Sequence, residues 1–547
     1  MDQRPANRSS RAQQIGILAL LALLFWGVSY GLLMQGDALD CEFGGHPDEA
    51  SHYVSGLMVY DYLSGHLGEH PLAFAETYYD FYPKVAIGHF PPGFYLFEAL
   101  WFFVSSGSVA SVLSFQCFVC GGIAALLAFV VYIGGGGRIV SLGAGIVFCS
   151  LPLIQRYSGM VMSDLLLGLF CLLSCLAFAW YLQRPSIWSS FLFGCLAAMS
   201  IMVKGSGLML AFVPPISLIL SRRYELFRAK SFWVAVLPVL VICLPWMLLT
   251  YKITEEGMVQ EWSPKYVAEA LPYFAKQMYR TFGLVLVVLL GFGLRRSLKG
   301  RVAAGCIPEL SAVMLALPIG LILTYILIPV GFEQRYLVPA VAPSLFFMAI
   351  GLGHFHRLLN ERWAEKWKTH LVMVLLVVGH GVEVFDIPAK RFQGFQSFVD
   401  AMGLKSDSEG KKILISSDSR GEGAVVAAVA MIDERPRHRV LRGSKVLSSS
   451  DWMGRGYSLA HTNAAALVQF VKEDEIDWVV VDASMQTSKI MDHNLQLENI
   501  VNTHPAVFSL VEERKIQRKY WGRNRKAALY KVIRDAGADG EDESEQH

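Results

Sequence analysis

Long stretches without a charged side chain alternate with short basic segments over most of the first 390 residues. Residues 15–34 (IGILALLALLFWGVSYGLLM) carry no charge, and residues 99–137 form an uncharged run of 39 residues. Further uncharged runs end at Arg156, Arg184, Lys204, Arg222 and Lys252. About 20 apolar residues let a helix cross the roughly 30 Å hydrocarbon layer of a bilayer. The pattern predicts a polytopic α-helical membrane protein, with residues 15–34 as a retained span rather than a cleaved signal peptide.

Basic clusters between the runs indicate which side each loop faces. They lie within residues 4–11, 222–230, 295–301 and 357–368. Short cytoplasmic loops collect Lys and Arg. We therefore expect residues 1–14 in the cytoplasm, and residues 36–91, residues 252–280 and the turn with Arg335 outside. Six candidate segments lie between residues 92 and 221, where an odd number of crossings is needed, so 11 and 13 spans both remain open.

The character of the chain changes from about residue 410. KKILISS (411–417) and DWVVVDAS (477–484) are short β-branched runs, whereas EGAVVAAVAMI and NAAALVQFVKEDE have helical spacing. A final span near residues 369–386 would deliver this region to the outside. The expected domains are a transmembrane catalytic domain (15–386) with external loop 36–91, a soluble extracytoplasmic α/β domain (387–534) and a disordered acidic tail (535–547).

Composition supports this organisation. Only 17% of the 547 residues are charged and the mean hydropathy is +0.41, whereas a soluble domain carries about a quarter charged residues. The net charge of +2 does not indicate nucleic acid as a partner. Of the nine cysteines only Cys41 lies in an expected external loop, so neither a disulfide framework nor a zinc motif is predicted.

The segment GGHPDEASHYVSG (44–56) places Asp48 and Glu49 between His46 and His52. The spacing over residues 48–63 predicts a helix in the membrane interface, because one stripe is apolar and the opposite face carries Ser51, His52 and Ser55. The two acids would lie at its positive N-terminal end, and His52 would share a face with Asp48. Acids begin many helices for dipole reasons alone, so this pair is informative only together with other polar residues.

Further along the chain, charged or ionisable residues lie within or beside the apolar runs: Lys84, His89, Asp164, Lys204, Glu333 and Arg335. A charge at the centre of a span costs about 2.5–3.5 kcal/mol on insertion scales and usually faces a partner or a cavity. For Asp164 and Lys204 the structural alternative is a helix-end residue that reaches out to water.

With these residues side by side, the chain resembles the GT-C superfamily of membrane glycosyltransferases. More narrowly, it is similar to the bacterial family 39 branch, which includes protein O-mannosyltransferases, aminoarabinose transferases of lipid A and RgtA-type glycosyltransferases. The resemblance covers about residues 15–355 and depends on the order of PDEASHYV, HFPPGFYLFEALWF, MVMSDLLLGLF, MSIMVKGSGLML and RYLVPAVAP. It implies a GT-C fold with 11–13 transmembrane helices and an extracytoplasmic C-terminal α/β domain, located in the bacterial inner membrane.

The resemblance also implies roles for single residues. Those expected in catalysis are Asp48, as the general base, Glu49 and Asp164. Those expected at the donor phosphate are Lys204, Arg335, Lys84 and His89, and those expected at the substrate are His52 and Tyr336. The family usually has a basic residue directly before the double proline. Here Phe90 intervenes, so His89 is one position off the pattern and Lys84 is a substitute.

The chemistry that follows is transfer of a sugar outside the cytoplasm. Nucleotide sugars are absent there, so the expected donor is a polyprenyl-phosphate-linked sugar in the bilayer. The acceptor is a lipid, a protein or a polysaccharide. A positioned carboxylate would deprotonate the acceptor hydroxyl, and a single displacement predicts inversion. The phosphate leaving group would need cations rather than a general acid.

A metal is not firmly expected as a cofactor. Histidine and carboxylate ligands suit zinc or manganese, which leaves a divalent metal as an alternative, with His46 and His89 as weak candidates. No spacing in the sequence matches a metal motif.

Two other function classes remain open. A lipid or sugar transporter or flippase also carries charges in its spans, although transporters tend to show internal repeats and sites near the midplane. A non-catalytic scaffold on the same fold would not need the carboxylates.

Overall fold

The computed structural model describes residues 11–256, 261–298, 308–362, 367, 368, 371, 381, 388–451, 454–518 and 526–534. The chain divides into two compact units. We call Met1–Leu39, Gly88–Phe97 and Ala110–Ala389 the helical unit, and Asp40–Ile87, Glu98–Val109 and Lys390–His547 the mixed unit. Most of the loop expected at residues 36–91 thus groups with the C-terminal region. The expected acidic tail (535–547) lies outside the described residues.

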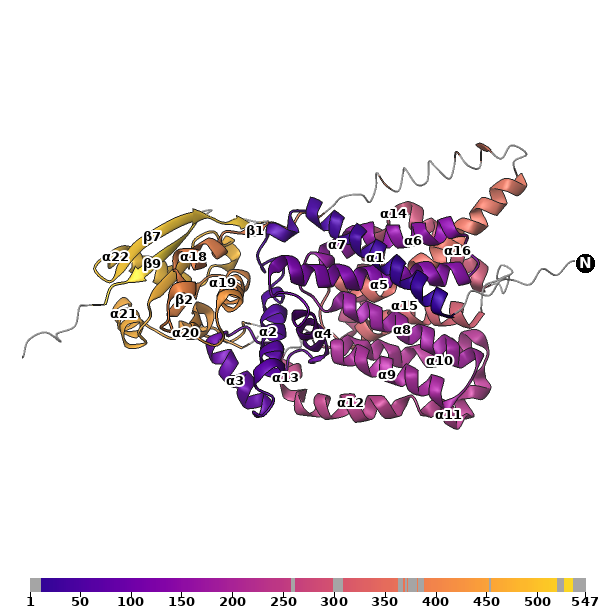
Figure 1. The fold of residues 1–547 in the computed structure, drawn as a ribbon, viewed down its shortest axis with the longest axis horizontal. Coiled ribbons are helices and arrows are strands. Elements are labelled where there is room, and N and C mark those ends of the chain that lie inside the picture. The colour runs from indigo at the N-terminus through magenta and orange to yellow at the C-terminus, as the bar shows by residue number, and fades with distance from the viewer. Residues whose placement is uncertain are drawn as a thin grey trace, which may run out of the picture. The chain divides into compact units, whose positions relative to one another are not determined.

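Helices make up the helical unit (Figure 1). In chain order they are α1 (Arg11–Gln35), α5 (Val109–Ile133), α6 (Arg138–Ser150), α7 (Pro152–Ser158), α8 (Asp164–Gln183), α9 (Ile187–Val203), α10 (Val213–Ser221), α11 (Lys230–Trp233), α12 (Val236–Leu249), α13 (Tyr251–Glu256), α14 (Pro264–Leu298), α15 (Pro308–Leu327) and α16 (Val338–Arg362). Short 3-10 turns include η2 (Gly205–Phe212), η3 (Tyr224–Arg228) and η4 (Gln334–Leu337). Helix α4 (Gly93–Phe102) follows the double proline, and η1 (Ala38–Asp40) follows α1.

Seven helices in the described part of the chain are long and apolar enough to cross a membrane, or eight if the bent pair α6–α7 forms one span. Two further apolar segments, Ile187–Val203 and Gly205–Ser221, are shorter. This count covers only the described residues, where several uncharged runs break into short helices, so the expected 11 or 13 spans stay a prediction. The span expected near residues 369–386 lies almost entirely outside the described residues. These helices make the chain an integral membrane protein, as its sequence predicted.

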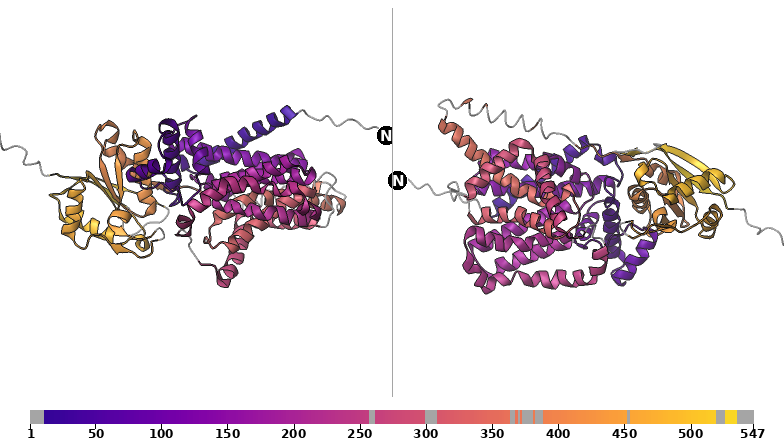
Figure 2. Two further views of the ribbon diagram at one scale, coloured as in Figure 1. Left: turned by 90° about the horizontal axis from the view of Figure 1, so that it is seen from below. Right: turned by 180° about the vertical axis from the view of Figure 1, so that it is seen from behind.

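Close helix packing builds the interior of this unit. Helix α8 packs against α9, α15 and α16, and α14 packs against α16. Figure 2 shows the bundled helices of this unit from two further sides. Gly293 and Gly351 lie at the α14–α16 contact, where an added Cβ would overlap the carbonyl oxygens of Phe347 and Leu289, respectively. Small residues let membrane helices approach closely.

A five-stranded sheet with the order β3-β2-β6-β9-β7 organises the C-terminal part of the mixed unit. Strands β2, β3 and β6 are parallel, whereas β9 is antiparallel to β6 and β7. The bounds are β2 (Lys412–Ser416), β3 (Arg439–Arg442), β6 (Trp478–Asp482), β7 (Phe508–Lys515) and β9 (Lys526–Val532). The predicted strands at 411–417 and 477–484 are confirmed as β2 and β6, which pair with Leu414 opposite Val479. The expected α/β fold of this region is therefore correct.

Helices and two small strand pairs surround this sheet. The helices are α18 (Phe395–Ala401), α19 (Ser419–Ile432), α20 (Gly443–Val446), α21 (Ala464–Glu473) and α22 (Asp492–Thr503), with short 3-10 turns η5 (Leu404–Ser406) and η6 (Thr487–Lys489). The antiparallel pairs are β1 (Phe392–Gln393) with β8 (Gln517–Arg518), and β4 (Ser448–Ser449) with β5 (Ser458–Leu459).

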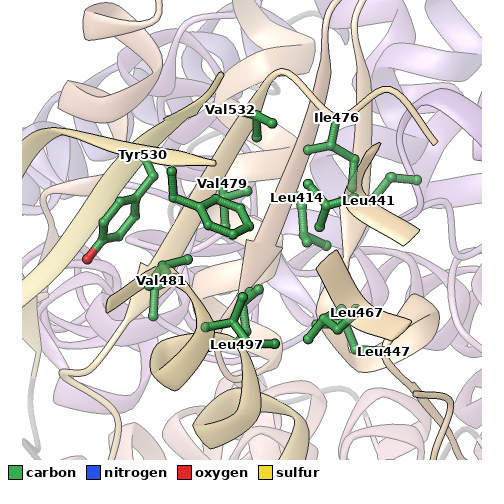
Figure 3. Close-up of a cluster of buried hydrophobic side chains, with 14 residues drawn as sticks. Leu414, Leu441, Leu447, Leu467, Ile476, Val479, Val481, Leu497, Tyr530 and Val532 are labelled. Atoms are coloured by element: carbon green, nitrogen blue, oxygen red, sulfur yellow. The ribbon is translucent and has the colours of Figure 1, made fainter. Parts of the chain in front are cut away.

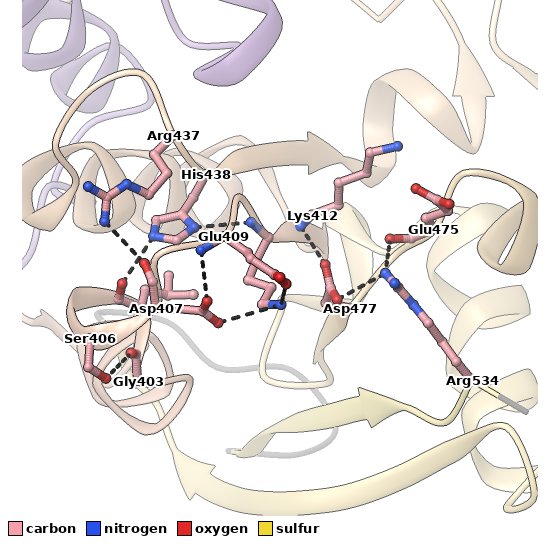
Figure 4. A network of polar contacts seen from close by, with 12 residues as sticks. Gly403, Ser406, Asp407, Glu409, Lys412, Arg437, His438, Glu475, Asp477 and Arg534 are labelled. Atoms are coloured by element: carbon pink, nitrogen blue, oxygen red, sulfur yellow. Dashed lines mark hydrogen bonds and ion pairs between the residues drawn. The ribbon is translucent and has the colours of Figure 1, made fainter. Parts of the chain in front are cut away.

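Apolar side chains from the sheet and its helices form a common core (Figure 3). Leu414, Val479 and Val481 from the strands meet Leu467 of α21 and Leu497 of α22. A polar network covers the amino-terminal ends of the same strands (Figure 4). There, Asp477 accepts hydrogen bonds from the Lys412 amide (2.9 Å) and from Arg534 (3.0 Å). This network stabilises the domain at the amino-terminal ends of the strands, opposite their carboxyl ends.

The helix predicted at residues 48–63 is present as α2 (Glu49–Gly65), followed by α3 (Pro71–Phe81). Its surroundings differ from the expectation of a helix lying in the membrane interface. Residues 49–58 are all buried, including the expected polar face with Ser51, His52 and Ser55. The reason is that α19 of the C-terminal region packs against α2. A single apolar stripe in the sequence does not reveal that both faces of a helix are covered.

Candidate active site

An ion pair inside the helical unit joins the ends of two helices. Asp164 begins α8, and Lys204 follows the last residue of α9. Lys204 Nζ lies 2.6 Å from Asp164 Oδ1, and both residues are buried. Asp164 Oδ2 has no hydrogen-bond partner among the described residues. Removing two charges from water is costly unless they pair, so this contact explains how both are tolerated.

A second ion pair lies on η4, between α15 and α16. Arg335 Nε lies 2.8 Å from a carboxylate oxygen of Glu333, and Arg335 is buried whereas Glu333 is partly exposed. Tyr336 connects the two pairs, because Lys204 Nζ and the Arg335 guanidinium lie 5.4 Å and 5.7 Å from its ring centroid. Such distances allow cation–π attraction.

An aromatic stack holds the ring of Tyr336. The ring of Tyr325 lies 4.5 Å from it at an interplanar angle of 12°, and the Tyr266 hydroxyl donates to the Tyr325 carbonyl at 2.8 Å. The structure thus brings together four predicted site residues: Asp164, Lys204, Arg335 and Tyr336. His89 belongs to the same unit and is half-buried in the loop before α4.

His46, Asp48, Glu49 and His52 belong to the mixed unit and lie at the start of α2. Asp48 precedes α2, and its side chain makes no capping hydrogen bond to that helix. His46 Nδ1 lies 3.5 Å from Asp48 Oδ2 and accepts a hydrogen bond from the Asp48 amide at 3.1 Å. The side chain of Asp48 is 23% exposed. His52, one turn further along, is buried.

Glu49 lies in a different environment from the partly exposed Asp48. Its side chain is fully buried, with one oxygen 2.6 Å from Lys390 Nζ and the other 2.8 Å from the Gly45 amide nitrogen. Lys390 was not among the predicted residues. Its partner lies 341 positions earlier in the chain, and no local pattern in the sequence reports such a pair.

Lys84 is also buried in the mixed unit. Its Nζ donates one long hydrogen bond, 3.4 Å, to the Pro47 carbonyl next to Asp48. Burial, and then the nearby Arg442, lower the pKa of Lys84 to about 7, while the carboxylates of Glu422 and Asp48 act in the other direction. A lysine with this pKa is charged for only part of the time near neutral pH.

The carboxyl ends of the parallel strands gather further polar groups. Arg518 pairs with Asp418 at 2.9 Å and with the buried Asp482, which also accepts from the Ser417 hydroxyl. Burial raises the pKa of Asp482, and the positive charge of Arg518 acts against that rise. These ion pairs and hydrogen bonds cover the carboxyl ends of the strands, although Arg518 Nε has no hydrogen-bond partner among the described residues.

No group of three or more His, Cys, Asp or Glu side chains in the described part of the chain is arranged to hold a metal ion. His46 and His89, the weak candidates, lie in different units.

Comparisons with known proteins give a likeness of fold. No protein-family model matches the chain, and no curated protein matches its sequence. The crystal structure of ArnT from Cupriavidus metallidurans bound to undecaprenyl phosphate is similar, with a TM-score of 0.55, 12% identity, and coverage of 95% of this chain and 98% of that one. The apo state of the same ArnT gives 0.54 and 13% identity, over the same shares of both chains.

A third solved structure is less similar. The archaeal oligosaccharyltransferase AglB from Archaeoglobus fulgidus, in complex with an inhibitory peptide and a dolichol-phosphate, has a TM-score of 0.49 at 13% identity. The matched region covers 86% of this chain and 70% of the AglB chain. On the likeness to ArnT over nearly the whole length of both chains, the protein has the GT-C fold that its sequence motifs predicted.

Proposed function

We propose that the protein is a membrane glycosyltransferase that moves a sugar from a polyprenyl-phosphate donor to an acceptor hydroxyl on the extracytoplasmic side. One observation carries the proposal. Two buried cations, Lys204 and Arg335, lie beside the ring of Tyr336 in a chain with the fold of ArnT, a protein solved with undecaprenyl phosphate bound.

The two cations suit a phosphate leaving group. As the bond between the anomeric carbon and the phosphate oxygen breaks, negative charge develops on the phosphate. Lys204 and Arg335 would stabilise that charge, and fixed charges in a site shielded from water are worth more than in bulk solvent. Lys84 and His89 would assist on the donor side, with His52 and Tyr336 in contact with the sugar or the acceptor.

The base in this proposal is Asp48. The acceptor oxygen forms the new bond to the anomeric carbon, Asp48 takes its proton, and the polyprenyl phosphate leaves with the electrons of the broken bond. The partial exposure of Asp48 supports this role, since a base must reach a substrate atom. Asp164, with one oxygen not hydrogen-bonded among the described residues, would orient a sugar hydroxyl. One displacement gives inversion at the anomeric carbon.

The test uses the full-length protein in lipid nanodiscs with labelled undecaprenyl-phosphate sugars and a crude envelope extract that contains lipid, protein and polysaccharide acceptors. We expect transfer by the wild type and a loss of at least about 100-fold in Asp48→Asn, which is typical for removal of a general base. Asp80→Asn is the matched control, because Asp80 lies on α3 in the same part of the chain, residues 40–87, and its exposed side chain makes no described ion pair. A parallel assay with a metal chelator tests whether transfer needs a divalent metal.

Each other result has a distinct meaning. Equal transfer by Asp48→Asn and the wild type would refute the base assignment. Movement of intact donor across the bilayer of sealed proteoliposomes, without transfer, would favour a transporter. A folded protein that neither binds nor consumes any donor would favour a scaffold.

A further inference from the structure

Lys390 contacts the segment before α2 at three points within the mixed unit. Its Nζ pairs with Glu49 at 2.6 Å and lies 5.9 Å from the ring centroid of Phe43, and its carbonyl accepts from the Cys41 thiol at 3.2 Å. The Lys390 side chain is only 7% exposed. One residue at the start of the C-terminal region therefore contacts both ends of residues 41–49.

The residues that follow Lys390 strengthen this attachment. The Glu42 carboxylate accepts hydrogen bonds from three successive amides, those of Gly394, Phe395 and Gln396, at 2.7, 3.2 and 2.8 Å. The Glu42 amide donates to the Phe392 carbonyl at 2.9 Å. Charge-assisted hydrogen bonds of this kind are among the stronger ones in proteins.

The Lys390 contact bears directly on Asp48 through the next residue. Glu49 is fixed at both carboxylate oxygens, by Lys390 and by the Gly45 amide. The backbone of Asp48 is consequently held between Gly45 and Glu49, which the hydrogen bond to the Glu49 carboxylate joins. Lys390 also neutralises the carboxylate adjacent to Asp48, which matters because a second negative charge close by would make Asp48 harder to ionise.

We propose that Lys390 is a positioning residue for transfer: its ion pair with Glu49 fixes the segment that carries Asp48, so the C-terminal region sets the orientation of the base. The inference rests on the proposed function of Asp48. Lys390 itself acts only through Glu49 and takes no part in bond making. A reacting group displaced by about 1 Å loses on the order of 100-fold in rate, so small changes at this anchor have large effects.

The test compares four full-length variants in nanodiscs with whichever labelled undecaprenyl-phosphate sugar the wild type consumes. They are Lys390→Met, Lys390→Arg, the double variant Glu49→Gln with Lys390→Met, and Arg435→Met. Arg435 is the matched control, because it also joins α2 to the C-terminal region through a partly buried pair with Asp61 (2.6 and 3.0 Å), but at the far end of the helix.

We expect Lys390→Met to lower kcat by about 100-fold with little change in the KM for the donor. In Lys390→Met, the acid limb of the pH profile of kcat/KM should move to higher pH, because the positive charge of Lys390 no longer offsets the negative charge of Glu49 beside Asp48. Lys390→Arg keeps the charge and should rescue most of kcat. The double variant removes both charges, so its acid limb should return toward that of the wild type while kcat stays low. Arg435→Met should melt at a lower temperature yet keep the kcat of the wild type.

Lys390→Met with the kcat and pH profile of the wild type would overturn the inference, and so would an equal loss of kcat in Arg435→Met. If Lys390→Met does not fold, the double variant, which removes both charges of the ion pair, decides: a kcat equal to that of the wild type overturns the inference. Transfer by Asp48→Asn equal to that of the wild type would separately refute the base assignment on which the inference rests, whatever the Lys390 variants do.

Discussion

The side-chain amine of Lys84 lies in a buried position where few groups can accept a hydrogen bond from it. It is 6% exposed, and its ammonium makes one long hydrogen bond, to Pro47. The charged groups around it are Arg442, Glu422, Asp48 and Asp418, with burial as the first cause of its lowered pKa. The folded state therefore loses this proton at about pH 7, well below the ordinary value of 10.5.

The sign of the resulting pH dependence follows from proton counting. Between about pH 7 and 10.5 the unfolded chain holds a proton on Lys84 that the folded protein has lost, so this residue makes the free energy of unfolding rise with pH. Below pH 7 its destabilising effect is complete. We predict that Lys84→Met is more stable than the wild type at pH 6, by a few kcal/mol at most, and that the difference shrinks toward pH 10. Melting temperatures of both proteins across this range check it. A constant difference would contradict the prediction.

At the scale of helices, α16 offers two glycines with contrasting neighbours. An added Cβ at Gly351 would overlap the Leu289 carbonyl oxygen of α14, whereas one at Gly353 meets nothing within 4 Å. Gly351→Ala should destabilise the protein by about 1–3 kcal/mol through overpacking. Gly353→Ala should be neutral or stabilising by up to about 1 kcal/mol, because Ala favours helix. Thermal unfolding of the two purified variants decides, and equal melting temperatures would show that α14 and α16 do not depend on this close approach.

At the scale of the whole molecule, the mixed unit combines segments that lie far apart in the sequence. Helix α2 packs against α19, and the Tyr82 hydroxyl donates to Asp433 at 2.5 Å. Residues 388–534 produced alone would expose the face of α19 that α2 covers. We predict that this fragment melts without cooperativity and binds a hydrophobic dye. Residues 40–87 joined to it by a flexible linker should restore a cooperative transition. A fragment that already melts cooperatively at the same temperature would refute the prediction.

The sequence predicts the elements better than their partners. Uncharged runs and β-branched runs are local signals, so the spans and strands β2 and β6 could be predicted. Asp164 and Lys204 could be selected because charges in apolar runs need compensation, and they do pair. The different environments of Asp48 and Glu49 could not be predicted, because they depend on Lys390, 341 residues from Glu49. The burial of His52 depends likewise on a distant helix.

That separation also sets an order of events during synthesis. Ribosomes add about 5–20 residues per second, so Lys390 is added to the chain roughly 20–70 s after Glu49. By the end of that interval most of the helical unit has been made, while the segment with Asp48 still lacks its anchor. A chain that terminates before residue 390 would therefore insert into the membrane as an inactive protein. Release of the finished C-terminal region, rather than membrane insertion, would be the step that makes each new molecule competent.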